Sequence, residues 1–133
     1  MSASAALTLS KEERLCSRTL IDRLFNGGGS RSMTAFPLRM VYLKADREPH
    51  APQVQMMVSV PKRYFKRAVK RNRVKRQVRE AFRKQKTALL ARMEVETGQQ
   101  LILAFIWLDA KLYDSKVVEQ RVGNLIERAS EKL

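Results

Sequence analysis

The feature that most constrains the fold is the apolar run from Leu101 to Leu108, which polar residues bound on both sides. The run is short for a helix and is rich in Ile and aromatic side chains. These properties favour a strand at the centre of a sheet over a helix. We therefore expect a fold organised around one buried strand.

Alternating apolar residues predict two further strands, at residues 36–45 and 53–60. In the first, Phe36, Leu38 and Met40 would face one way, together with Tyr42. The connection between the strands is short and contains two prolines. This pattern predicts that the two strands form an antiparallel pair.

Three helices complete the prediction. Ser17 can cap a short first helix, which the glycines at residues 27–29 would end. The second helix runs from Ala68 into the low 90s, and the third follows a cap at Asp114. The order α-β-β-α-β-α is typical of a two-layer α+β domain, with helices segregated around a small, mainly antiparallel sheet.

At 133 residues the chain has the length of one domain, which we assign to residues 10–133. Residues 1–9 are small and weakly patterned and are expected to form a flexible tail. No apolar stretch approaches the roughly 18 residues of a membrane span, and the N-terminal residues do not resemble a secretion signal. Because Cys16 is the only cysteine, a reducing compartment is favoured, and we expect a cytoplasmic protein without membrane contact.

The positive charge of the chain is concentrated in residues 62–84. Twelve of these 23 residues are Lys or Arg and only Glu80 is acidic, so the segment carries +11 of the net +14. Elsewhere 15 basic residues face 12 acidic ones. An imbalance confined to one segment predicts that this segment binds a polyanion.

Helical spacing sorts this segment into two faces. An apolar stripe is expected to anchor the helix on the core and consists of Val74, Val78, Ala81, Phe82 and Leu89. The opposite, basic stripe consists of Asn72, Lys75, Arg76, Arg79 and Arg83. Glu80 cannot neutralise these cations, so their mutual repulsion makes a merely solvated face costly. The neutral amide of Asn72 can hydrogen-bond a base edge or a 2′-hydroxyl as well as a phosphate.

The sequence offers little material for chemistry by the protein itself. His50 is the only histidine, and no Cys-His ligand set is present. The acidic residues are scattered and form no cluster of the kind that holds two metal ions in a nuclease. We predict neither catalytic nor metal-binding residues in this chain.

Residues 66–83 resemble the signature helix of the bacterial ribonuclease P protein subunit. The hallmark Arg-Asn-Arg triplet of that family is matched by Arg71-Asn72-Arg73. The segment Ser59-Val60-Pro61-Lys62 is similar to the family's Ser-Val-Ser-Lys strand end, with Pro61 in place of a serine. The resemblance extends over about residues 14–130, and it implies one extra short strand and a left-handed crossover to the signature helix.

The resemblance also implies a function. The chain would be the accessory subunit of a ribonucleoprotein endoribonuclease, as a monomer in a 1:1 complex with the catalytic RNA, and precursor tRNA would be its second partner. The chemistry and the Mg²⁺ ions would belong to the RNA. The residues expected to bind RNA are Lys62, Lys66, Lys70, Arg71, Asn72, Arg73, Lys75, Arg76, Arg79 and Arg83.

In this family the 5′ leader of precursor tRNA lies in a cleft between the sheet, the first helix and the signature helix. The matching positions are Ile21, Phe25, Phe36, Arg39, Lys75 and Arg79. Aromatic side chains beside cations are what single-strand binding uses, although Phe25 and Phe36 would also suit the core. Ile21 replaces a common phenylalanine and Arg39 stands where an aromatic is often found, so stacking is expected to be partly exchanged for guanidinium or phosphate contacts.

Other classes of function stay open. Composition alone fits a ribosomal or ribosome-assembly protein that binds ribosomal RNA without any reaction; only the Arg-Asn-Arg helix and the predicted topology favour ribonuclease P. A stand-alone nuclease is disfavoured by the missing acidic cluster. A membrane-binding amphipathic helix is disfavoured because its apolar face is needed for the core.

Overall fold

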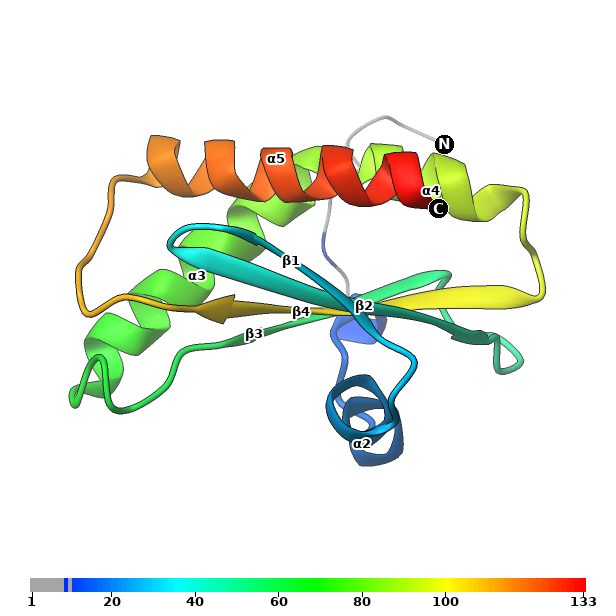
Figure 1. Cartoon of the computed structure of the whole chain (residues 1–133), viewed down its shortest axis with the longest axis horizontal. Helices are drawn as coiled ribbons and strands as arrows, with labels where there is room; N and C mark the ends of the chain where they lie inside the picture. The colour runs from blue at the N-terminus through cyan, green and yellow to red at the C-terminus, as the bar shows by residue number, and fades with distance from the viewer. Residues whose placement is uncertain (1–8, 10) are drawn as a thin grey trace.

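The computed structural model describes residue 9 and residues 11–133, which form an α+β fold. Helices α3, α4 and α5 cover one face of a four-stranded sheet and α2 lies on the other face (Figure 1). The elements are η1 (Lys11–Glu13), α2 (Arg18–Asn26), β1 (Arg31–Ala35), β2 (Leu38–Asp46), β3 (Val54–Ser59), α3 (Ala68–Gln85), α4 (Thr87–Glu94), β4 (Gln99–Trp107) and α5 (Ser115–Lys132). The predicted order is confirmed, with β1 as the extra strand.

The apolar run predicted as a central strand is β4, which has a neighbour on each side in the order β1-β2-β4-β3. It pairs antiparallel with β2 from Leu38↔Trp107 onward and parallel with β3 from Val54↔Leu101 onward. Alternate residues of β4 enter the core clusters on opposite faces of the sheet. The continuous apolar pattern is therefore explained, because both faces of this strand are covered.

The predicted antiparallel pair of residues 36–45 and 53–60 is wrong. Both strands exist as β2 and β3, but β4 lies between them and each bonds to it instead. The segment from β3 through α3 and α4 returns the chain beside β3 as a parallel neighbour. Side-chain alternation defines the faces of a strand but not its partners, so the pairing could not be read from it.

The N-terminal end of β2 also differs from the prediction. β1 and β2 form a hairpin that closes at Ala35↔Leu38, and Phe36 and Pro37 make the turn, with a cis peptide between them. Phe36 therefore lies outside the strand and is 57% exposed. It does not belong to the core.

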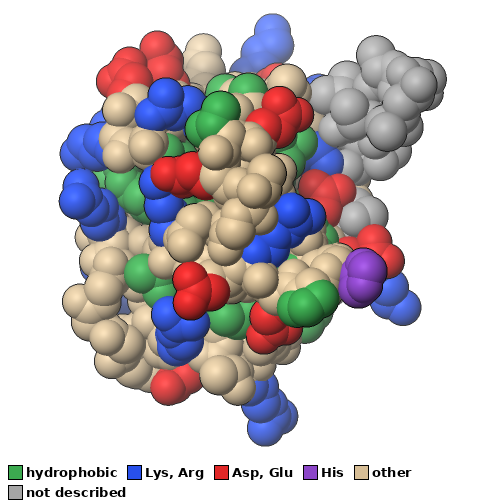
Figure 2. All heavy atoms as spheres, turned by 90° about the vertical axis from the view of Figure 1, so that its right-hand side faces the viewer, with side chains coloured by type: hydrophobic (Ala, Val, Ile, Leu, Met, Phe, Trp, Pro, Cys, Tyr) green, Lys and Arg blue, Asp and Glu red, His purple; other side chains and the backbone are tan. Residues whose placement is uncertain are grey.

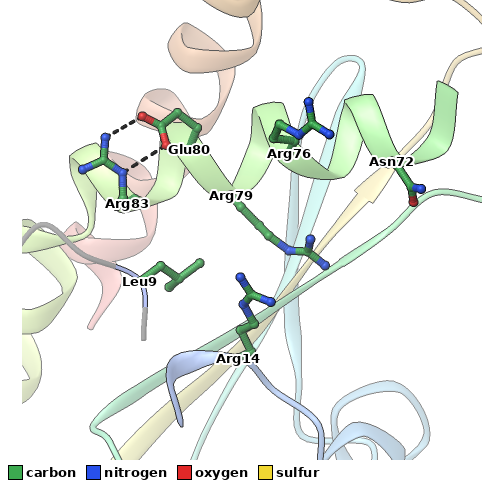
Figure 3. A pocket seen from close by; sticks show the side chains of 7 residues that line it. All are labelled: Leu9, Arg14, Asn72, Arg76, Arg79, Glu80 and Arg83. Atoms are coloured by element: carbon green, nitrogen blue, oxygen red, sulfur yellow. Dashed lines mark hydrogen bonds and ion pairs between the residues drawn. The ribbon is translucent and has the colours of Figure 1, made fainter. Parts of the chain in front are cut away.

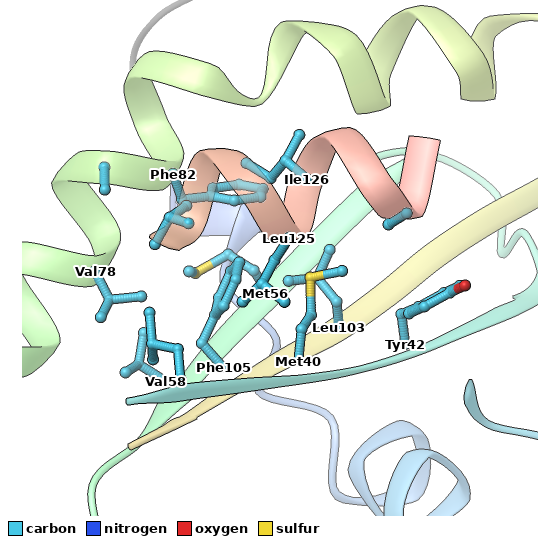
Figure 4. Close-up of a cluster of buried hydrophobic side chains, with 14 of the residues drawn as sticks. Met40, Tyr42, Met56, Val58, Val78, Phe82, Leu103, Phe105, Leu125 and Ile126 are labelled. Atoms are coloured by element: carbon cyan, nitrogen blue, oxygen red, sulfur yellow. The ribbon is translucent and has the colours of Figure 1, made fainter. Parts of the chain in front are cut away.

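The larger core lies between the sheet and helices α3, α4 and α5. Figure 4 shows Phe82 of α3 and Leu125 of α5 meeting Phe105 of β4. The rings of Phe82 and Phe105 pack edge to face with centroids 6.0 Å apart. Every residue of the predicted apolar stripe is buried: Val74, Val78, Ala81, Phe82 and Leu89. This packing fixes which face of α3 is turned to solvent.

A smaller core holds α2 on the opposite face of the sheet. Leu20 and Leu24 pack there with Val41, Ile102 and Ala104. The predicted N-terminal cap is confirmed, because the Oγ atom of Ser17 accepts a hydrogen bond from the backbone N–H of Leu20 at 3.3 Å. After the helix, Gly28 adopts the left-handed conformation with φ of 83°.

The helix predicted from Ala68 into the low 90s is divided at Lys86 into α3 and α4. Lys86 is 2% exposed, and its Nζ atom lies 2.6 Å from Oε2 of Glu13. No Pro or Gly marks this division, and the partner is 73 residues away, so local sequence could not predict it.

The last helix begins after Asp114 as predicted, although the Asp114 side chain makes no capping hydrogen bond. The predicted N-terminal tail lies outside the described residues except for Leu9, which packs against the larger core. None of the helices in the described part of the chain combines the length and the apolarity that crossing a membrane requires.

Candidate nucleic-acid interface

The solvent-facing side of α3 carries the predicted basic stripe. Asn72 and Arg76 are exposed, whereas Lys75, Arg79 and Arg83 are half-buried. The cations that extend the patch are exposed in the preceding loop and the first turns of α3: Lys62, Arg63, Lys66, Arg67, Lys70 and Arg73. The sequence prediction of an anchored helix with a cationic outer face is confirmed.

Within the Arg71-Asn72-Arg73 triplet, Arg71 lies in a different environment from the other two residues. The Nη1 atom of Arg71 donates to the carbonyl oxygens of Phe65 and Lys66, both at 2.8 Å. Arg71 therefore holds the loop before α3 against the helix, while Asn72 and Arg73 are exposed to solvent. This structural role of Arg71 was not predicted, because the carbonyl groups it binds lie in a loop whose path depends on the fold.

A cavity of about 500 Å³ runs along α3 (Figure 3). It is lined by Leu9, Arg14, Asn72, Arg76, Arg79, Glu80 and Arg83. Four of these seven side chains are guanidinium groups, which suit bidentate contacts with phosphate oxygens. Arg14 was missing from the sequence prediction because it lies far from residues 62–84 in the chain.

Glu80 neutralises one of these guanidinium groups. Its carboxylate accepts hydrogen bonds from Nε of Arg83 at 3.0 Å and from Nη2 of Arg83 at 2.5 Å. The bond from Arg83 lowers the pKa of Glu80, and the same bond raises the pKa of Arg83. The carboxylate thus stays ionised at neutral pH and offsets the charge of one cation in the stripe.

Arg79 lies where α3 approaches the sheet. Its pKa is lowered by partial burial and, to a smaller extent, by the charge of Arg14. Both arginines also line a second cavity of about 310 Å³ with Leu15, Cys16, Met56, Met57 and Val58. The basic stripe is therefore continuous with a partly apolar hollow at strand β3.

The structure brings together only some of the residues predicted to hold the leader. Phe25, 42% exposed, and Arg39 line a cavity of about 330 Å³ beside Ile106. Ile21 is half-buried and packs on the smaller core. Phe25 and Arg39 therefore provide an aromatic ring and a guanidinium group at one hollow.

Phe36 and Lys75 are not among the lining residues of these hollows. Phe36 is in the β1–β2 turn, where its carbonyl oxygen accepts a hydrogen bond from Nε of Arg121 at 2.9 Å. Neither residue lines the cavity that contains Phe25 or the two that contain Arg79. These three cavities therefore do not join all six predicted residues.

The end of the molecule that carries the β2–β3 connection has a mixed charge, unlike the cationic face of α3. Figure 2 faces this end and shows Lys and Arg interspersed with Asp and Glu around His50. In residues 9 and 11–133, no group of three or more His, Cys, Asp or Glu side chains is placed to hold a metal ion. The excess of positive charge thus belongs to α3 and the loop before it rather than to the whole surface.

The sheet order and the cationic helix anchored beside it define a class of small basic α+β domains. The family model described as "Ribonuclease P" matches residues 9–130. The chain therefore belongs to the ribonuclease P protein family.

Relatives within this family cover most of the chain. The ribonuclease P protein component of Porphyromonas gingivalis is 42% identical over 128 residues, which span 96% of this chain and 90% of that protein. The component from Chlorobaculum tepidum is 35% identical over 95 residues, or 68% of this chain and 60% of that protein.

Solved structures share the fold. The ribonuclease P protein of Thermotoga maritima aligns with a TM-score of 0.64 at 21% identity, over 87% of this chain and 96% of that one. The protein from Staphylococcus aureus aligns with a TM-score of 0.58 at 18% identity, over 92% and 93%. The arrangement of helices around the sheet is thus a property of the family.

Proposed function

We propose that this chain is the protein subunit of a cytoplasmic ribonuclease P, and that it promotes endonucleolytic maturation of the 5′ end of tRNA. It acts as a monomer bound 1:1 to the catalytic RNA, and it also contacts precursor tRNA. Membership of the ribonuclease P protein family supports this proposal.

The observation that carries the proposal is the face of α3. One side of this helix is buried in the core, so its exposed cations are held on a rigid element and point outward together. Residues 62–84 carry a net charge of +11, and their cations repel one another unless a polyanion binds. Binding of RNA phosphates releases counterions and relieves this repulsion.

The hollows that contain Arg79 and Phe25 are the proposed sites for the leader. Arg79 of the basic stripe lines the hollow at strand β3, and Phe25 with Arg39 lines the hollow next to α2. Single-stranded RNA offers unstacked bases to aromatic rings and phosphates to guanidinium groups. Contacts of this kind favour precursor tRNA over mature tRNA, because only the precursor has a leader.

The described side chains do not suit a Mg²⁺ site, because Mg²⁺ prefers grouped oxygen ligands and no such group is present among them. We therefore assign Mg²⁺ and the hydrolytic chemistry to the RNA subunit. The protein contributes by neutralising phosphates and holding the substrate in place, which lowers the entropic part of the barrier.

Reconstitution tests this function directly. Precursor tRNA is incubated with the protein, with a bacterial ribonuclease P RNA, and with both at low Mg²⁺. We expect no cleavage by the protein alone and faster cleavage by the RNA when the protein is added. Cleavage without the RNA, or no gain from the protein, would contradict the proposal.

A further inference from the structure

The segment between η1 and α2 runs along the edge of the sheet and carries Arg14 to a fixed place. The backbone N–H of Leu15 donates to the carbonyl oxygen of Met56 at 2.7 Å, and Arg14 forms a parallel bridge with Met56. Nearby, Nε2 of Gln55 donates to the carbonyl oxygen of Glu12 at 2.9 Å. The N-terminal segment is thus attached to β3 by backbone and side-chain bonds.

From this place Arg14 points toward Arg79 of α3. Figure 3 shows the two guanidinium groups turned toward each other across the cavity beside α3. Among the described residues, no carboxylate forms an ion pair with either group; Glu80, the acidic residue of this cavity, bonds Arg83. Two like charges that face each other are stabilised by an anion between them.

The pair also occupies a junction. Arg14 and Arg79 line both the cavity of about 500 Å³ along α3 and the cavity of about 310 Å³ beside β3. Asn72 lies in the first cavity and Met57 in the second. The two arginines therefore lie where the cavity along the helix adjoins the cavity at the sheet.

The residue before Arg14 is tied to the helices. Oε2 of Glu13 lies 2.6 Å from Nζ of Lys86, and the side chains of these two residues are 16% and 3% exposed. This pair connects the N-terminal segment to the junction of α3 and α4. It restricts the position of the adjacent Arg14 relative to the helix that carries Arg79.

We propose that Arg14 and Arg79 form a clamp for one phosphodiester of single-stranded RNA, and that the Glu13–Lys86 ion pair positions Arg14 in it. A phosphodiester has two unesterified oxygens, which suits one guanidinium on each side. The identification of the strand as the 5′ leader rests on the proposed function; the two-sided contact with a phosphodiester does not.

The clamp is tested by binding of a fluorescently labelled five-nucleotide single-stranded RNA to the protein alone. Arg14→Gln and Arg79→Gln are each expected to weaken binding about fivefold to tenfold, as for loss of one charge-assisted contact. Arg92→Gln is the matched control, because this exposed arginine of α4 lines none of the three cavities and removes the same charge. A loss in the control equal to that in the other two variants would overturn the clamp.

The double variant decides whether the two arginines hold the same phosphate. We expect Arg14→Gln with Arg79→Gln to weaken binding much less than the product of the single losses, because each contact depends on the other. Losses that multiply would show two independent sites and would refute the clamp. Competition with inorganic phosphate separates a free anion from a phosphodiester: a double variant that loses phosphate binding but keeps oligonucleotide binding would also refute it.

The positioning role has its own readout. Glu13→Gln, checked for native circular dichroism, should weaken oligonucleotide binding in the parent protein but not in the Arg14→Gln background. Glu13→Asp, which keeps the charge, should recover part of the loss. An equal loss in both backgrounds would contradict positioning of Arg14. Because these measurements use neither ribozyme nor tRNA, a failed cleavage reconstitution would refute the proposed function and leave the clamp unaffected.

Discussion

Nζ of Lys86 lies 2.6 Å from Oε2 of Glu13, although 73 residues separate the two in the chain. The lysine side chain is 3% exposed, and the residue lies between the end of α3 and the start of α4. A buried cation is tolerated only when an acceptor accompanies it. The bond therefore joins the N-terminal segment to the helix that carries the basic stripe.

Breaking this pair should destabilise the fold. Lys86→Met leaves the Glu13 carboxylate partly buried beside an apolar side chain, so the free energy of unfolding should fall by about 3 kcal/mol. Lys84→Met, an exposed neighbour, should change it by less than about 0.5 kcal/mol. Urea unfolding at pH 7 measures both. Adding Glu13→Gln to Lys86→Met should restore part of the loss, and no restoration would contradict a charge-based cause.

Removal of the carboxylate of Glu80 should strengthen RNA binding. The pKa of Glu80 is lowered by its bond from Arg83, so at pH 7 the residue is ionised and opposes the basic stripe. Glu80→Gln should tighten binding to ribonuclease P RNA about twofold to threefold, the scale of an exposed ion pair. The salt dependence should steepen by up to about 0.7 to 0.9 in log–log slope. Filter binding over a salt series tests this, with Glu94→Gln in α4 as the control; an equal gain in the control would point to net charge alone.

Close packing of α3 on α5 predicts that Gly123→Ala lowers the stability of the parent protein but raises the stability of the Gln85→Ala variant. A Cβ atom at Gly123 would lie within van der Waals overlap of Oε1 of Gln85, whose Nε2 donates to the carbonyl oxygen of Glu119 at 2.9 Å. Gly123→Ala should therefore destabilise the protein by about 1 kcal/mol, the scale of one hydrogen bond. In the Gln85→Ala background the same change should stabilise it by about 0.5 to 1 kcal/mol through helix propensity. Thermal unfolding of the parent protein, the two single variants and the double variant measures these effects. A stability change of the same sign in both backgrounds would refute the packing argument.

Patterns of apolar residues predicted the central strand β4 and the buried face of α3, because both depend only on residues close together in the sequence. The apolar run at residues 101–108 identified β4, because a strand covered on both faces needs no polar positions. Helical spacing placed Val78 and Phe82 in the core and Arg76 on the surface. The cationic face of α3 was predictable for the same reason.

Pairing and long-range contacts were not predictable in this way. The partner of β3 depends on where α3 and α4 return the chain, so the β2–β3 pair was wrong. Arg14 meets Arg79 only through the path of the N-terminal segment along β3. Phe36 is exposed because it lies in the turn between β1 and β2, whereas the alternating pattern had predicted that the strand begins at this residue.

Loss of Lys75 and Arg79 should affect precursor tRNA more than mature tRNA. Lys75→Ala with Arg79→Ala removes two cations of the basic stripe, of which Arg79 also lines the hollow at strand β3. Precursor binding to the holoenzyme should weaken about tenfold, which corresponds to about 1.4 kcal/mol, and mature tRNA binding should change little. The control Arg92→Ala with Lys116→Ala removes the same charge at exposed sites on α4 and α5. Equal losses for both tRNAs would refute a leader contact.

A pH-dependent contact is expected in the loop before α5. The hydroxyl of Tyr113 donates to Oδ2 of Asp109 at 2.5 Å, and the ring packs edge to face on Trp107. This bond lowers the pKa of Asp109 and raises the pKa of Tyr113. Its stabilisation is therefore complete between about pH 4 and pH 10, the ordinary pKa values of the two groups. It is lost as the pH falls through the lowered pKa of Asp109 or rises through the raised pKa of Tyr113.

Tyr113→Phe keeps the ring and removes the hydrogen bond, so it should lower the melting temperature at pH 7. The difference from the parent protein should shrink below about pH 4, where Asp109 becomes protonated in the unfolded chain and then in the folded one. Tyr64→Phe is the control, because the Tyr64 hydroxyl accepts from Arg63 and has no carboxylate partner among the described residues. Its difference from the parent should not vary over this range. Thermal unfolding from pH 2.5 to pH 7 gives both series, and a Tyr113→Phe difference that is constant with pH would show that the bond to Asp109 contributes nothing to stability.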